Sequence, residues 1–198
     1  MATQVLFIQG GSEGAYEADR LLADSLQKAL GHGYRVQYPR MPDEDDPQYH
    51  AWKTAIEASL AKIRGPIALV GHSLGAFMLV KLLAETKLPT DLIGLFLIAT
   101  PFVSATEGWQ FPDMAPPKSF AKKLNAVRIF LYHSRDDEVV PFEHLALYRA
   151  KLPRATMHVF EGRGHQFRND LTEVADDIRR HATEQSARLD VNPHALDG

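Results

Sequence analysis

The sequence predicts an α/β fold in which a mostly parallel six-stranded sheet is covered by helices on both faces. Short apolar runs of strand length alternate with longer segments that have helical spacing. Several of the short runs are apolar throughout, which is typical of strands buried on both faces of a parallel sheet. Repeated β-α-β units with right-handed crossovers place helices on both sides of such a sheet.

The order of elements follows from these patterns. Six segments are expected to form strands: 5–8, 34–38, 67–70, 92–99, 127–132 and 156–160. Helical spacing of apolar residues over 18–30 ends at Gly31, which suits a left-handed helix stop. A second stripe covers 49–63. Asp170 and Glu173 resemble a capping box ahead of the last helix.

No internal repeat or linker divides the chain, so residues 1–182 are expected to form a single domain. A chain of 198 residues with 45% hydrophobic content can bury a sizeable core in one domain. Two stretches depart from the alternation. Residues 102–120 form a long insertion with aromatic and proline residues, and residues 183–198 are expected to form a polar, frayed tail.

Composition excludes several classes of function. The net charge of -3 shows no basic excess, so we expect neither a nucleic-acid partner nor an anionic membrane surface. The absence of cysteine excludes disulfides, thiolate metal sites and a cysteine nucleophile. The longest apolar stretch, 92–99, is far shorter than the roughly 18 residues of a membrane span. The run 5–8 is too short for a signal peptide. A cytoplasmic protein is therefore expected.

The clearest chemical signal is the Gly-x-Ser-x-Gly motif of residues 71–75, "GHSLG". It follows a predicted buried strand and opens an apolar helix, which is the context that a nucleophile elbow requires. Its two glycines would let strand and helix approach closely around a strained turn that displays the Ser73 hydroxyl. The alternative is a plain strand-to-helix turn in which Ser73 is a cap.

A serine nucleophile needs a base, and the base needs an orienting acid. His165 in "EGRGHQF" follows the strand at 156–160 and is the candidate base. Asp136 and Asp137 in "SRDDEVVP" follow the strand at 127–132. Since successive side chains at a strand end point in opposite directions, only one of them can face His165. The other histidines are weaker candidates, and the side chain of His72 is expected to point away from Ser73.

Neither a cofactor nor a metal site is predicted. Residues 10–15, "GGSEGA", lack the third glycine of a dinucleotide fingerprint and the Gly-Lys-Ser/Thr of a P-loop. The acidic cluster at 43–46, "DEDD", is better explained as a solvated loop before a helix than as a metal site. No His-x-x-x-His or cysteine pair supports a transition metal.

"GHSLG", "SRDDEVVP", "GRGHQF" and the strand ending in "IQGG" together resemble the α/β-hydrolase superfamily. The resemblance extends over residues 5 to about 181. Within the superfamily, the chain is similar to the small, nearly cap-free retinoblastoma-binding-protein type of short serine hydrolase. The resemblance implies the strand order 2-1-3-4-5-6. It also implies a triad of Ser73 as nucleophile, His165 as base and Asp137, from an Asp-x-x-Val-Pro pattern, as acid.

The same resemblance implies an oxyanion hole formed by two backbone N–H groups. One belongs to Leu74, and the other to Gly11, with Ser12 as the alternative donor. Gln9 stands where the family usually has a histidine that braces this loop.

The implied activity is hydrolysis of a small or medium carboxylic ester, or a related acyl compound, without a cofactor. The alternatives are a non-catalytic binding protein, an acyltransferase or a lyase on the same fold. The insertion at 102–120 is predicted to form a short lid over a shallow acyl pocket, with packing against the domain's own helices as the alternative. The expected lining side chains are Phe102, Trp109, Phe111, Met41 and Phe167.

Overall fold

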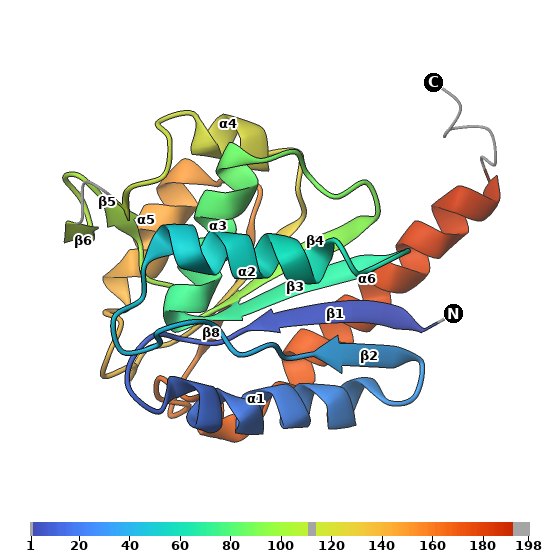
Figure 1. Ribbon diagram of the computed structural model, residues 1–198, viewed down its shortest axis with the longest axis horizontal. Coiled ribbons are helices and arrows are strands. Elements are labelled where there is room, and N and C mark those ends of the chain that lie inside the picture. The colour runs from blue at the N-terminus through green and yellow to red at the C-terminus, as the bar shows by residue number, and fades with distance from the viewer. Residues whose placement is uncertain (1, 111–113, 192–198) are drawn as a thin grey trace.

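The computed structural model describes residues 2–110 and 114–191 of the chain (Figure 1). Its strands are β1 (Thr3–Ile8), β2 (Tyr34–Gln37), β3 (Ile67–His72), β4 (Leu92–Ile98), β5 (Val103–Ser104), β6 (Trp109–Gln110), β7 (Ile129–Ser134) and β8 (Thr156–Phe160). Six of them form one sheet in the order β2-β1-β3-β4-β7-β8, in which every neighbouring pair is parallel. The predicted class is therefore confirmed.

Helices cover both faces of this sheet, as predicted. They are α1 (Ala15–Leu30), α2 (Tyr49–Leu60), α3 (Ser73–Glu85), α4 (Phe120–Leu124), α5 (Glu143–Lys151) and α6 (Thr172–Val191), with a 3-10 turn η2 (Phe167–Asn169). Figure 1 shows α1 and α6 on one face and α2 and α3 on the other, with α4 and α5 beyond α3. This layering places one hydrophobic cluster on each side of the sheet.

The strands contribute to the two clusters alternately. On β1, Leu6 and Ile8 belong to the cluster below α2 and α3, whereas Val5 and Phe7 belong to the cluster below α1 and α6. All four side chains are fully buried. A strand that buries both of its faces needs apolar residues at every position, which explains the continuous apolar runs in the sequence.

Two details differ from the expectations. The short strands β5 and β6 pair with each other inside the insertion, and they precede the fifth strand of the main sheet in the numbering. Helix α6 continues to Val191, so residues 183–191 are helical where a frayed tail was expected. Arg128 helps to hold this part of the helix, because its guanidinium lies 2.9 Å from His181 Nδ1 and donates to Glu184 at 3.0 Å.

Candidate active site

The turn between β3 and α3 has the geometry of a nucleophile elbow. β3 lies centrally in the sheet, between β1 and β4, and ends at His72. Ser73 follows at once as the first residue of α3, with a φ of 50°. This left-handed region is unfavourable for a residue with a side chain and is associated with functional sites. His72, rather than Ser73, occupies the N-cap position, so the turn does not exist to cap the helix with Ser73.

Gly75 allows the beginning of α3 to rest directly on the end of β1. A Cβ atom at this position would lie 2.0 Å from the carbonyl oxygen of Gln9 and 2.6 Å from that of Ile8. Any side chain here would force the helix away from the sheet. The second glycine of the motif therefore brings the elbow next to the loop that follows β1, where an oxyanion donor was predicted.

The predicted base and acid contact each other. His165 Nδ1 lies 2.9 Å from Asp137 Oδ1 and 3.0 Å from Oδ2. Oδ1 of Asp137 also accepts the backbone N–H groups of Val139 at 2.9 Å and Val140 at 2.8 Å. Burial opposes the charge on Asp137, but the hydrogen bond and attraction of His165, together with these N–H groups, outweigh it and hold the pKa of Asp137 below its ordinary value. A carboxylate in this position can orient the imidazole as a base.

The two neighbouring carboxylates, Asp136 and Glu138, have a different role. Asp136 accepts hydrogen bonds from the Ser134 hydroxyl and, at 3.4 Å, from the backbone N–H of Gly164. Glu138 accepts the backbone N–H of His165 at 3.1 Å. These contacts fasten the loop that carries His165 to the end of β7. Asp136 thus braces a loop.

Ser73, His165 and Gly11 line one cavity of about 130 Å³ at the carboxyl edge of the sheet. Gly11 rests on Leu74, since a Cβ at Gly11 would lie 2.5 Å from Leu74 Cδ2. Within residues 2–110 and 114–191, neither the Gly11 N–H nor the Leu74 N–H donates to a protein acceptor. The two predicted oxyanion donors are therefore adjacent and available, whereas the N–H of Gly10 is already bonded to Asp19.

The loop after β1 is braced by Gln9 in the absence of the usual histidine. Gln9 is fully buried; its Oε1 accepts the Met41 N–H at 3.0 Å and its Nε2 donates to Glu44 Oε2 at 2.7 Å. The same Glu44 oxygen accepts the N–H of Tyr16 at the start of α1, also at 2.7 Å. One residue of the acidic cluster 43–46 is thus a structural brace. In the described ranges, no group of three or more histidine, aspartate or glutamate side chains is arranged to hold a metal ion.

Sequence reasoning missed a second buried polar group next to the triad. Asp19 Oδ2 lies 2.8 Å from His72 Nδ1, and His72 Nε2 lies 3.0 Å from the backbone oxygen of His165. The rings of His72 and His165 lie 4.7 Å apart between centroids, so the expectation that His72 points away from the site is wrong. A signal was present: Asp19 shares the buried stripe of α1 with Leu22 and Leu26, where an aspartate requires a partner.

The surroundings of this second pair favour the charged form of each side chain. Burial disfavours the charged forms of both side chains, but mutual attraction and hydrogen bonding outweigh it. The pKa of Asp19 is lowered as a result, and that of His72 is raised. Both nitrogens of His72 face oxygen acceptors, which an imidazolium satisfies as a double donor.

Three of the histidines rejected as bases, His133, His144 and His158, have structural partners. His133 Nε2 lies 2.9 Å from the backbone oxygen of Val140. His144 Nδ1 accepts the N–H of Phe102 at 2.9 Å. His158 stacks on Tyr132, with 4.8 Å between ring centroids.

Four of the five side chains predicted to bind substrate do not line the candidate cavity. Phe102, Met41 and Phe167 are 2–3% exposed and belong to the hydrophobic clusters. Trp109 is half-buried and packs edge-on against His144, 5.8 Å away. None of these four lines the cavity that holds Ser73, and Phe111 lies outside the described residues. The structure thus gives the first three a packing role.

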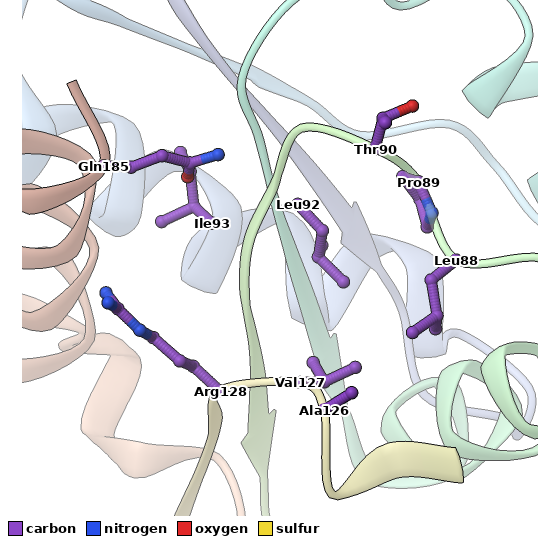
Figure 2. A pocket seen from close by; sticks show the side chains of 9 residues that line it. All are labelled: Leu88, Pro89, Thr90, Leu92, Ile93, Ala126, Val127, Arg128 and Gln185. Carbon is purple, nitrogen blue, oxygen red and sulfur yellow. The ribbon is translucent and has the colours of Figure 1, made fainter. Parts of the chain in front are cut away.

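Four other cavities in the described ranges contain no member of the triad. One of about 280 Å³ lies at the amino ends of β4 and β7, the sheet edge opposite to Ser73, and Figure 2 shows Arg128 and Gln185 on one side of it and Leu92 and Val127 further across. Another of about 770 Å³ borders the insertion. The smaller cavity at Ser73 is therefore the candidate active site. No helix in the described ranges is both long and apolar enough to cross a membrane.

Comparisons with known proteins agree with this geometry. A family model described as Serine hydrolase matches residues 22–169. Among solved structures, the ydeN gene product from B. subtilis has a TM-score of 0.70 at 20% identity, covering 92% of this chain and 100% of its own. Est1E from Butyrivibrio proteoclasticus has a TM-score of 0.66 at 16% identity, with 94% and 89% covered. A structure from work on carboxylesterases of Nitrososphaera gargenis has a TM-score of 0.63 at 14% identity, covering 94% of this chain and 92% of its own. A search of curated proteins gives no match.

Proposed function

Because the chain belongs to the Serine hydrolase family, we propose that it cleaves small or medium carboxylic esters, or related acyl compounds, through a covalent acyl-enzyme on Ser73. The observation that carries this proposal is the His165–Asp137 hydrogen bond beside a serine held at positive φ in the same cavity. A cytoplasmic location and a small-molecule acyl substrate are part of the same proposal.

The chemistry follows from the positions of the groups. Ser73 Oγ attacks the acyl carbon while His165 Nε2 accepts its proton, and Asp137 stabilises the imidazolium that forms. The backbone N–H groups of Gly11 and Leu74 hold the developing oxyanion. Collapse of the tetrahedral intermediate breaks the ester bond, and His165 returns the proton to the leaving alcohol. A water molecule deprotonated by His165 then attacks the acyl-enzyme and releases the acid.

The preference for carboxylic esters draws on the relatives. The structures from Nitrososphaera gargenis work concern carboxylesterases, and ferulic acid is bound to Est1E in one of its structures. These statements apply to those proteins, whose identity to this chain is 14% and 15%. They favour an ester as the first substrate class to test.

The acyl-enzyme is the species that tests this proposal most directly. Mixing the protein with a slight excess of p-nitrophenyl acetate should give a burst of p-nitrophenol and an acetyl adduct by intact-mass spectrometry, located on the peptide that contains Ser73. Repeating the reaction with a competing alcohol distinguishes a hydrolase from an acyltransferase. An adduct on another residue, or acyl transfer mainly to the alcohol, would contradict the proposal.

The size of the cavity predicts a preference for short acyl groups. A space of about 130 Å³ beside Ser73 leaves little room for a long chain, so rates across p-nitrophenyl esters should peak at short chains and fall as the acyl group lengthens. If residues 102–120 act as a lid, Trp109→Ala should change this preference more than it changes the melting temperature. An optimum at long chains would contradict the size prediction, and a Trp109→Ala variant that only unfolds would contradict the lid.

A further inference from the structure

We propose that Asp19, His72 and Gln166 are positioning residues, which fix the oxyanion loop, the elbow and the loop of the base relative to one another. We call these three side chains, with the N–H of Gly10, the Asp19 network. The inference rests on the proposed function, because it assigns the network a role in that reaction.

A single carboxylate joins three segments that are far apart in the sequence. Oδ2 of Asp19 accepts the backbone N–H of Gly10 at 2.7 Å and lies 2.8 Å from His72 Nδ1, and Oδ1 accepts Gln166 Nε2 at 2.7 Å. Asp19 is only 1% exposed. Each partner is adjacent in the chain to a predicted catalytic group: Gly10 to Gly11, His72 to Ser73, and Gln166 to His165.

His72 closes the network on the side of the base. Its Nε2 lies 3.0 Å from the backbone oxygen of His165, and it is itself 2% exposed. A carbonyl oxygen can only accept, so this nitrogen carries a proton. The residue before the nucleophile thus holds the backbone of the base directly. Movement of Asp19 would shift the oxyanion loop and the base loop together.

The proton pattern of the network requires a carboxylate at position 19. Oδ2 faces two donors and Oδ1 faces a third, so an asparagine, which has the same shape, offers one acceptor too few. If the asparagine nitrogen takes the place of Oδ2, two hydrogen-bond donors face each other, this amide group and the N–H of Gly10. If the asparagine nitrogen takes the place of Oδ1, the side-chain amide of Gln166 can flip and accept a hydrogen bond from it. His72 then either remains a buried cation without a counter-ion, or loses a proton and with it one of its two hydrogen bonds.

A charge exchange restores every bond. In the double variant Asp19→Asn/Gln166→Glu, the asparagine oxygen accepts from Gly10 and His72, and its amide group donates to the new carboxylate at position 166. The formal charge of the network is the same as in the original protein. Gln166→Glu alone instead places two carboxylates against each other, which is unfavourable.

The test compares the two single variants, the double variant and the original protein in a double-mutant cycle. A fluorophosphonate titrates the active sites of each protein to the end point, and kcat is expressed per titrated site. We expect Asp19→Asn to lower kcat per titrated site about 10- to 100-fold with little change in KM, because a misplaced oxyanion loop and base act on the transition state. Gln166→Glu should also lower kcat per titrated site, and the double variant should recover it to within about threefold of the original protein, above both single variants. Asp24→Asn, an exposed aspartate on the same helix, is the matched control.

The outcomes separate positioning from folding and from the function itself. A role only in stability would lower the melting temperature and the titratable fraction, but leave kcat per titrated site unchanged, and would overturn the inference. If Asp19→Asn fails to fold, the double variant decides: recovered folding and kcat support the network, and a folded but equally impaired double variant contradicts it. Failure of the original protein to label at Ser73 would instead contradict the proposed function.

Discussion

Replacing Ser73 with alanine is expected to abolish ester hydrolysis and labelling by a fluorophosphonate probe while leaving the protein folded. The side chain is small and lies at the start of α3, where alanine fits without a cavity in the core. Loss of the nucleophile removes the acyl-enzyme route, so kcat should fall by a factor of about 10⁴ or more. Hydrolysis of p-nitrophenyl acetate and gel detection of the labelled protein measure the two effects.

The alanine variant should be about as stable as the original protein, because serine and alanine carry the same Cβ atom and the substitution neither adds to nor relieves the strain of the positive φ at this position. Ser186→Ala, which changes an exposed serine on α6, serves as the control and should keep full activity and labelling. Turnover or labelling that survives in Ser73→Ala would rule out Ser73 as the nucleophile and would move the search to another cavity.

The elbow and the candidate base could be predicted because their signals are local, whereas the choice of Asp137 over Asp136 came from the resemblance to the α/β-hydrolase superfamily. A buried strand, a glycine-flanked serine and a helix follow one another within a few residues, and the parallel sheet gathers successive strand ends at one edge. In a parallel sheet, the carboxyl ends of β3, β7 and β8 lie at the same edge. The long-range information that this prediction needs is the strand order, which the resemblance implies.

The Asp19 network could not be predicted in this way, because its contacts are long-range. Asp19 and His72 are 53 positions apart, and Asp19 and Gln166 are 147 apart. A residue at a strand end normally alternates direction with its neighbour, which suggested that His72 points away. The chain turns sharply at Ser73, however, and Asp19 then holds the His72 ring beside that of His165. Side-chain direction at a turn depends on such partners rather than on strand periodicity.

The role of the insertion at 102–120 could not be predicted from the sequence for a different reason. The same large apolar residue types occur in the sequence whether their side chains line a pocket or fill a core. Phe102 is 3% exposed and contacts Phe120 and Tyr148, whereas Trp109 is only half-buried. The distinction depends on which helix approaches each ring, and spacing in the sequence carries no such information.

Asp137→Asn is expected to reduce turnover strongly, whereas Asp136→Asn should leave most of it. The asparagine oxygen can keep the two backbone bonds that Oδ1 of Asp137 makes with Val139 and Val140. Its amide nitrogen then replaces Oδ2, 3.0 Å from His165 Nδ1. Since the oxygen kept at Oδ1 also lies 2.9 Å from Nδ1, the amide group competes with it for this nitrogen and increases the share of the tautomer with the proton on Nε2, which cannot accept the proton of Ser73. The variant also lacks the negative charge that stabilises the imidazolium. By analogy with other triads, kcat should fall about 10²- to 10⁴-fold.

The adjacent residue provides the matched control for this experiment. Asp136 carries the same charge and accepts hydrogen bonds from Ser134 and Gly164, but it makes no hydrogen bond with the His165 ring in the described ranges. Removal of its charge tests whether any nearby negative charge would suffice. Kinetics of both variants with p-nitrophenyl acetate, normalised to titrated sites, distinguish the two roles. Strong loss in Asp136→Asn with activity retained in Asp137→Asn would reassign the acid, because the hydrogen bond to His165 Nδ1 would then not be the one that orients the base.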